Sequence, residues 1–388
     1  MTTSKKKSKD VEQPRTLKPA RILISGYYGF SNLGDEAILT SMQNALLQQN
    51  SEAELTVLSV NPEVTRQSHK LRSISRTDFY AIWSELGKSN LLISGGGSLL
   101  QDVTSSRSLR YYLAILLLAI LHRCPFMIYA QGIGPLNGRW NRYLTALILK
   151  QAKVITVRDT ESVQELQRLG LKAERIQLSA DPVLLFPRPE PMAGERLLQE
   201  MKLDQGSGPL IGVSVRPWGD NGKWVEQLAI TLDRLVAEKN ARIIFLPMQE
   251  NDDEKISQTI RFRMQNNNQT TILPSGHHVE DVISLIDACD LLIGVRLHAL
   301  VFAAVAQTKA IAIRYDPKVD HFARRVQQTI AGNILQLKSD ELYTLIVQQL
   351  NSGSDLGETE QQTLNHLREQ AMLSAKLAFA VIEEARHE

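Results

Sequence analysis

The sequence predicts an α/β protein made of two Rossmann-like, doubly wound domains with a central cleft. Short apolar segments alternate with longer amphipathic segments after residue 20, which is typical of parallel strands joined by crossover helices. The alternation stops once, in a stretch rich in proline and glycine, and then restarts. A chain of 388 residues is long enough to bury a core in each of two domains.

We expect a first domain over residues 21–188, a linker over 189–208 and a second domain over 209–350. Residues 355–388 have the pattern of one long helix, which we expect to pack back across the first domain. The expected strands are apolar runs that end in turn residues, at 21–25, 54–60, 90–97, 125–134, 153–159 and 175–182, then 209–215, 242–249, 270–274, 290–295 and 310–315.

Residues 1–20 are polar and rich in lysine, and they lack the apolar core of a secretory signal. We expect a disordered basic tail. We expect its lysines, at positions 5, 6, 7 and 9, to make the tail soluble, with peripheral contact with anionic lipid headgroups as the alternative. The longest apolar run, residues 111–121, is too short for a bilayer span of about 20 residues. It predicts a buried helix, with a membrane-facing helix as the alternative.

The composition excludes several classes of protein. Lys and Arg number 44 against 42 Asp and Glu, so the net charge of +2 provides no field that would attract nucleic acid, and we expect no nucleic-acid partner. Two cysteines, Cys124 and Cys289, exclude a disulfide scaffold and a cysteine zinc site, and they fit a cytoplasmic protein. We expect no metal site, and the sequence does not indicate an oligomeric state.

Ligands of doubly wound folds bind beyond the carboxyl ends of the strands, so candidate binding residues are sought there. In the loop after the first strand, Gly29 permits a tight turn, and Asn32 and Asp35 either cap the next helix or meet a ligand hydroxyl. In a later glycine triplet, Gly96 and Gly97 either present backbone N–H groups to an anion or let a helix approach the sheet.

Cationic side chains of the first domain also follow strand ends. Arg139 and Arg142 come after the loop QGIGP and are the best partners that this domain offers for an anion. Arg158 ends another strand, although a structural ion pair with Asp159 or Glu161 explains it equally well.

In the second domain, Arg296 and His298 lie where a buried strand gives way to a helix of small residues. Imidazole titrates near neutrality, so His298 is suited to donate and accept a proton in one cycle. A structural histidine is the alternative. Lys318 follows the next strand at the same sheet edge, and a histidine flanked by Arg296 and Lys318 indicates an anion site with a proton donor.

Seven motifs, taken in order over residues 21–325, resemble the polysaccharide pyruvyl transferase family, specifically the CsaB-type cell-wall enzymes. They are GYYGFSNLGDEAIL, LLISGGGSLLQD, YAQGIGPL, VRDTES, SADPVLLF, GVSVRPW and GVRLHALVFAAVA. The resemblance implies a GT-B-like fold and an enzyme that moves a pyruvyl group from phosphoenolpyruvate to a sugar, typically N-acetylmannosamine, of a lipid-linked cell-wall polysaccharide precursor. A 4,6-ketal forms and phosphate leaves. Phosphoenolpyruvate is then a co-substrate with no resident cofactor, and a cytoplasmic place, peripheral at the inner face of the plasma membrane, fits the lipid-linked acceptor.

Carried over by motif, the resemblance makes His298 the catalytic residue and Lys318 the lysine that binds phosphoenolpyruvate. The upstream arginine of the family falls on Arg139, with Arg142 as the fallback. Two alternative functions stay open: a GT-B glycosyltransferase that uses a nucleotide sugar, and a non-catalytic glycan-binding module. We expect His298 and Lys318 to meet a guanidinium of the first domain across the cleft.

Overall fold

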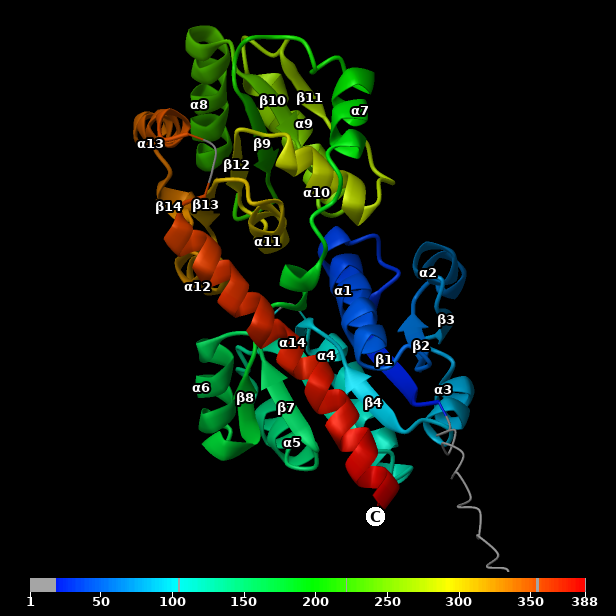
Figure 1. The fold of residues 1–388 in the computed structure, drawn as a ribbon. Helices are drawn as coiled ribbons and strands as arrows, with labels where there is room; N and C mark the ends of the chain where they lie inside the picture. The colour runs from blue at the N-terminus through cyan, green and yellow to red at the C-terminus, as the bar shows by residue number, and fades with distance from the viewer. Residues whose placement is uncertain (1–18, 104, 221, 354–355, 388) are drawn as a thin grey trace, which may run out of the picture.

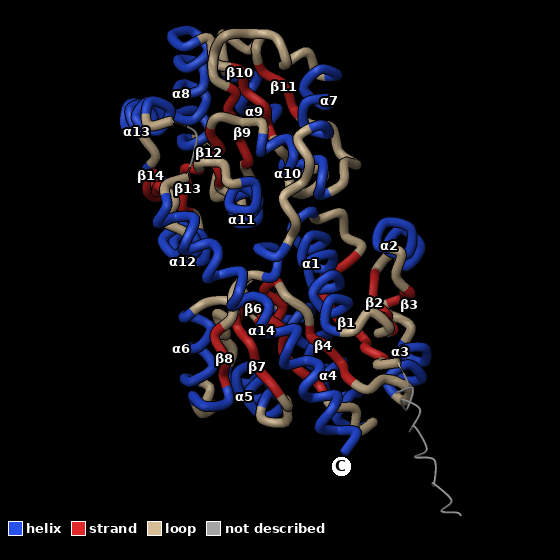
Figure 2. The backbone as a smooth tube through the Cα atoms, viewed as in Figure 1, coloured by secondary structure: helices blue, strands red, loops and turns tan. Residues whose placement is uncertain are grey.

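A computed structural model describes residues 19–103, 105–220, 222–353 and 356–387. Two parallel sheets, each flanked by helices, form two lobes joined end to end (Figures 1 and 2). The α/β fold class with two sheets is therefore confirmed. The basic tail expected at residues 1–20 lies outside the described residues, apart from its last two.

The sheet of the first domain has eight strands, and all its pairings are parallel. Along the sheet they run β3 (Arg72–Ser75), β2 (Glu54–Ser59), β1 (Arg21–Tyr28), β4 (Leu91–Ser94), β6 (Phe126–Ile133), β7 (Val154–Val157) and β8 (Ile176–Leu178), with β5 (Gly97–Leu100) pairing with β6.

Alternating side chains of these strands give the sheet two apolar faces. In β1, Leu23 packs in the cluster under α3, α4, α5 and α6, whereas Ile22 and Ile24 pack in the cluster under α1 and α14. The helices of this domain are α1 (Leu33–Gln49), α2 (Pro62–His69), α3 (Phe79–Leu86), α4 (Ser106–Leu121), α5 (Arg139–Leu149) and α6 (Thr160–Arg168), with the short helices η1 (Ala173–Arg175) and η2 (Pro182–Leu185).

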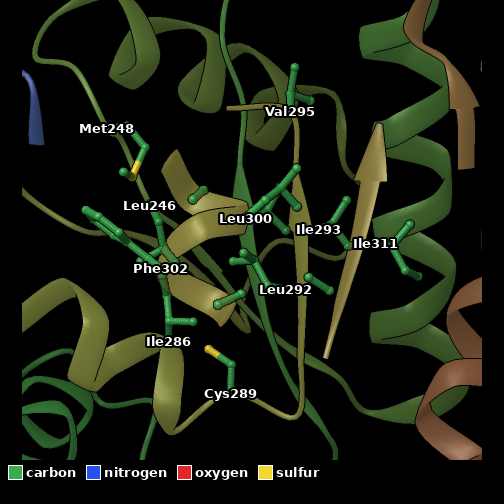
Figure 3. Close-up of a cluster of buried hydrophobic side chains, with 14 of the residues drawn as sticks. Leu246, Met248, Ile286, Cys289, Leu292, Ile293, Val295, Leu300, Phe302 and Ile311 are labelled. Atoms are coloured by element: carbon green, nitrogen blue, oxygen red, sulfur yellow. The ribbon is translucent and has the colours of Figure 1, made fainter. Parts of the chain in front are cut away.

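The second domain has a six-stranded parallel sheet. Its strands run β11 (Thr270–Ile272), β10 (Arg242–Phe245), β9 (Leu210–Ser214), β12 (Leu291–Gly294), β13 (Ala310–Arg314) and β14 (Thr329–Asn333). The helices are α7 (Met192–Glu200), α8 (Lys223–Lys239), α9 (Asp252–Arg263), α10 (Val279–Asp287), α11 (Leu297–Ala306), α12 (Pro317–Arg325), η3 (Ile334–Gln336) and α13 (Ser339–Asn351). Figure 3 shows the core of this domain, where Leu292 and Ile293 of β12 lie beside Leu300 and Phe302 of α11.

Two segments tie the chain together outside the sheets. Helix α7 lies within the expected linker and packs on α10, where the Gly194 amide donates to the Ser284 hydroxyl at 2.8 Å. Helix α14 (Glu358–His387) follows the second domain and returns across the first, packing against α1, β6 and β7 (Figure 1). Among the described helices, none has both the length and the apolar character needed to cross a bilayer.

The first turn of α1 forms a seam between the two domains. The Leu33 amide donates to the Met248 carbonyl at 3.0 Å, and Asn32 forms an isolated antiparallel bridge with Gln249. The N-terminus of α1 is therefore held directly against the loop after β10.

Candidate functional site

His298 lies in the first turn of α11, directly against the first turn of α1. A Cβ atom on Gly34 would lie 2.0 Å from His298 Nδ1 and 2.4 Å from Cγ, so the approach depends on glycine. The opposite ring nitrogen, Nε2, is buried and has no hydrogen-bond partner among the described residues. A buried polar atom without a partner is costly, and it marks a position that a ligand can satisfy.

Burial lowers the pKa of His298 to about 4, because desolvation disfavours the imidazolium ion. The negative charge of Asp181 opposes this shift, while the positive charges of Arg158 and Lys318 strengthen it. Near neutral pH the imidazole is therefore uncharged and able to accept a proton.

Asp35 follows Gly34 in α1 and is the second titratable group at this seam. Its Oδ1 lies 3.1 Å from where a Cβ on Gly97 would stand, so the glycine loop after β4 gives the carboxyl group room. Burial, followed by the charge of the neighbouring Glu36, raises the pKa of Asp35 to about 7. Near neutrality this carboxyl group keeps a large protonated fraction, whereas His298 is neutral.

A cavity of about 400 Å³ lies between the domains, and it is lined by Leu297, the neighbour of His298 in α11, but not by His298 itself. This volume is within the usual range for small-molecule sites, roughly 300–1,000 Å³. Its walls come from both domains and from α14: Arg158, Asp159, Thr160, Glu161, Ala180, Asp181, Leu184, Leu297, Lys318, His321, Phe322, Arg324, Arg325 and Leu367. The first turns of α6 and α12 both face this space, and helix N-termini favour anions.

Helix α12 supplies one wall of the cavity through side chains spaced three and four residues apart. Lys318, His321, Phe322 and Arg325 lie on one face of the helix. The Lys318 side chain is 34% exposed, and its Nζ lies 3.9 Å from Asp316 Oδ2. The expected lysine thus lies at the cavity. The other three residues were not predicted, although their helical spacing from Lys318 is a signal in the sequence that identifies them.

Arg158 is the cation that the first domain places on the cavity wall. Its side chain is only 6% exposed, and it donates to Asp181 at 2.7 Å and to the Ser98 hydroxyl at 3.1 Å. The sequence left a pair with Asp159 or Glu161 open. In the structure Asp181 is the close partner, and Asp159 lies farther away at 3.8 Å.

Two side chains of α12, Arg325 and His321, contact the first domain across the cavity. The Arg325 guanidinium donates to the Arg158 carbonyl, to the Ser179 carbonyl at 2.9 Å and to the Gln370 side chain. His321 Nδ1 lies 3.2 Å from Glu161 Oε2. These contacts hold the two walls at a fixed separation.

The structure does not bring Arg139 into this group. Arg139 begins α5 at the sheet edge that faces the second domain, but it is exposed and is not part of the cavity wall. Its role as a ligand stays a prediction. The fallback, Arg142, donates to Glu165 at 2.8 Å and to the Leu136 carbonyl at 3.0 Å, so its guanidinium is used within the first domain.

Arg296 and Asn32, which we also expected at the ligand, make structural contacts at the seam. Arg296 forms an ion pair with the fully buried Asp253, and Asp253 accepts from the Met248 amide at 3.1 Å. This pair fixes the loop that holds α1. The Asn32 side chain caps α1 by accepting from the amides of Gly34 and Asp35.

Two of the expected glycines serve the packing around α1. Gly29 has a φ of +79°, and its amide donates to Glu36 at 2.8 Å. A Cβ on Gly96 would lie 2.8 Å from the Ile38 side chain, so Gly96 permits a close approach of α1 to the loop after β4.

The architecture is that of GT-B glycosyltransferases and epimerases. Similar solved structures include HepE from Anabaena in complex with UDP-glucose, at 13% identity and a TM-score of 0.60 over 95% of this chain and 98% of that chain. UDP-GlcNAc 2-epimerase from Neisseria meningitidis has 10% identity and a TM-score of 0.63, covering 94% and 100%. A glycosyltransferase from Rickettsia africae has 11% identity and a TM-score of 0.59, covering 96% and 97%. At such identities the likeness defines the fold alone.

The sequence profile of the polysaccharide pyruvyl transferase family matches residues 32–317, and the chain belongs to this family. It is also similar to the amylovoran biosynthesis protein AmsJ from Erwinia amylovora, with 19% identity over 428 aligned residues that cover 94% of this chain and 99% of AmsJ. The matched region includes the first-domain residues of the cavity wall and Leu297, and it ends one residue before Lys318. The chain is therefore a transferase with a role in polysaccharide modification.

Proposed function

We propose that this chain transfers the pyruvyl group of phosphoenolpyruvate to a sugar of a polysaccharide precursor, with N-acetylmannosamine as the expected acceptor. The observation that carries the proposal is the neutral imidazole of His298, whose Nε2 has no partner among the described residues, next in α11 to Leu297, which lines a cavity together with Lys318 and Arg158. Membership of the pyruvyl transferase family supports the same reaction.

The charges at the cavity suit phosphoenolpyruvate, which carries a phosphate and a carboxylate. Lys318 supplies a compact positive charge from the first turn of α12. Arg158 and Arg325 add positive charge to the same wall, while their guanidinium groups hold the protein partners described above. Arg139, which the family resemblance implies as a further ligand, lies at the same sheet edge as Arg158.

In the proposed reaction, a proton adds to the methylene carbon of phosphoenolpyruvate and gives an oxocarbenium-like centre at C2. A sugar hydroxyl attacks C2, and His298 accepts the hydroxyl proton. The C2–O bond to phosphate then breaks, and a second hydroxyl closes the 4,6-ketal. Its proton leaves with the released phosphate. Asp35 is suited to donate the first proton because burial keeps it partly protonated near neutrality.

His298 has two conceivable roles in this reaction: it protonates the methylene carbon, or it accepts the proton of the sugar hydroxyl. A histidine with a pKa of about 4 is almost entirely deprotonated at neutral pH, so it has no proton to donate and can act only as an acceptor. We therefore assign the proton relay from the sugar to His298 and the protonation of carbon to Asp35.

The test measures phosphate release from phosphoenolpyruvate with candidate acceptor glycans, together with recovery of an acid-labile pyruvate ketal. Positioned acid–base catalysis contributes roughly 10² to 10⁴-fold. His298→Ala is expected to lose about that much turnover while keeping its fold, and His387→Ala, at the exposed end of α14, is the matched control.

A folded His298→Ala protein with wild-type turnover would refute the role of the histidine. Stabilisation of the chain by nucleotide sugars but not by phosphoenolpyruvate would instead support the glycosyltransferase alternative.

A further inference from the structure

Two neighbouring helices of the first domain present an exposed apolar face on the side of the sheet opposite α14. We call it the α4–α5 face. Its residues are Leu117 and Leu121 on α4 and Trp140, Tyr143, Leu144 and Leu147 on α5. Trp140 is 77% exposed and Leu121 is 62% exposed. The two helices pack against each other, so their exposed side chains belong to one surface.

The spacing on α5 shows that this exposure is systematic. The four exposed positions follow the i, i+3, i+4, i+7 pattern of one helix face, while Thr145, Ile148 and Leu149 are buried against the domain. Scattered exposed apolar residues are normal, but contiguous ones on adjacent helices mark an interaction surface. Helix α3 adds Tyr80 and Trp83, which are 85% and 44% exposed, and it packs beside α4.

The two helices that form this face carry basic side chains and no acidic ones. Residues 103–153 contain seven Lys and Arg and no Asp or Glu, although the whole chain is almost balanced. Of the nearby acidic residues, Asp102 accepts a hydrogen bond from the backbone at the start of α5 and Glu165 is paired with Arg142. Arg110 lies seven residues before Leu117 on α4, and Lys150 directly follows α5; both are exposed. A protein partner with an apolar patch does not require this charge bias, whereas a surface of anionic lipid headgroups does.

We propose that the α4–α5 face docks on an anionic lipid bilayer, with Trp140 and Tyr143 at the level of the headgroups and the basic side chains paired with lipid phosphates. Aromatic rings favour this interface, and binding increases with both buried apolar area and the attraction of basic residues to anionic lipid. The docking does not depend on the proposed reaction. Because α5 begins at the sheet edge that faces the second domain, a docked chain keeps that edge close to the lipid.

The experiment is co-sedimentation of the full chain with vesicles of phosphatidylcholine alone and of phosphatidylcholine with about 30% phosphatidylglycerol. We expect binding to the anionic vesicles that weakens as salt rises to about 0.5 M. A Trp140→Ser, Tyr143→Ser, Leu147→Gln variant is expected to lose at least about tenfold in partitioning. An Arg110→Gln, Lys150→Gln variant is expected to show a weaker preference for anionic lipid than the wild type.

Phe262→Ser is the matched control, since Phe262 is 89% exposed on α9 of the second domain. It is expected to bind vesicles like the wild type. The lysines of residues 1–18 are present in every variant, so they cannot produce a difference between them. Equal binding by the α5 triple variant and the control, or no binding by the wild type, would overturn the proposal. A dimer in solution that the triple variant dissociates, without vesicle binding, would assign the face to a second copy of the chain and overturn it as well.

Discussion

Gly34→Ala tests a close contact between the two domains, that of α1 with His298. A methyl group at this position would lie 2.0 Å from Nδ1 of His298, well inside van der Waals contact. Overpacking of this kind costs about 1–3 kcal/mol. In the absence of that contact, alanine would stabilise the α1 helix by roughly 0.5–1 kcal/mol relative to glycine. Gly34→Ala should therefore destabilise the protein when the imidazole of His298 is present and stabilise it when the imidazole is absent.

Thermal melting of the wild type, Gly34→Ala, His298→Ala and the double variant measures this dependence. For domains of about 150–250 residues, a change of about 1 kcal/mol in the free energy of unfolding shifts Tm by roughly 2–4 °C. Gly34→Ala alone is expected to lower Tm by about 2–12 °C. In the His298→Ala background it is expected to raise Tm by about 1–4 °C. Equal Tm shifts in the two backgrounds would show that the side chains do not touch, and the placement of His298 against α1 would be wrong.

Two further predictions concern the ligand and the pH profile. Lys318→Ala is expected to weaken phosphoenolpyruvate binding by about 10- to 100-fold in calorimetry, since hydrogen bonds to charged groups contribute about 1.5–3 kcal/mol; unchanged binding would contradict its role. Asp35 has a pKa raised to about 7, so its proton, present below that pH, is lost above it, and wild-type kcat/KM is expected to fall above about pH 7. Asp35→Asn is expected to be slower by roughly 10² to 10⁴-fold and to lack this alkaline fall, so a retained fall would argue against Asp35 as the donor.

Most of the fold follows from local patterns in the sequence. Each expected apolar run corresponds to a strand, because buried parallel strands are continuous apolar segments. The sequence did not predict β3, β5 and β14. Strand β3 has the sequence RSIS at the sheet edge, β5 begins with Gly97 at a φ of +90°, and every residue of β14 is only partly buried. None of the three has the apolar run that a fully buried strand requires.

The site was less predictable because it forms where the two domains meet. The motifs located His298 and Lys318, since each follows a strand end within one domain. Glu161 and Arg325 gain their roles only when α12 lies across the cavity from α6, and that placement depends on contacts between distant segments. The same reason explains Arg296: a strand-end arginine suits an anion, but the buried Asp253 on α9 takes it as an ion-pair partner.

The seam between the domains has to be rigid, whereas the cavity has to admit a substrate. These two requirements conflict in many enzymes. The first turn of α1 is held rigidly at the seam. The Leu33 amide donates a hydrogen bond to the Met248 carbonyl, and the Met248 amide donates one to the Asp253 carboxylate. At this seam His298 Nε2 is buried with no partner among the described residues, which costs the folded protein about 1–3 kcal/mol. In the proposed reaction a substrate hydroxyl donates a hydrogen bond to this nitrogen and removes that cost. Under this proposal, binding and proton transfer use the same unpaired nitrogen at the junction of the two domains.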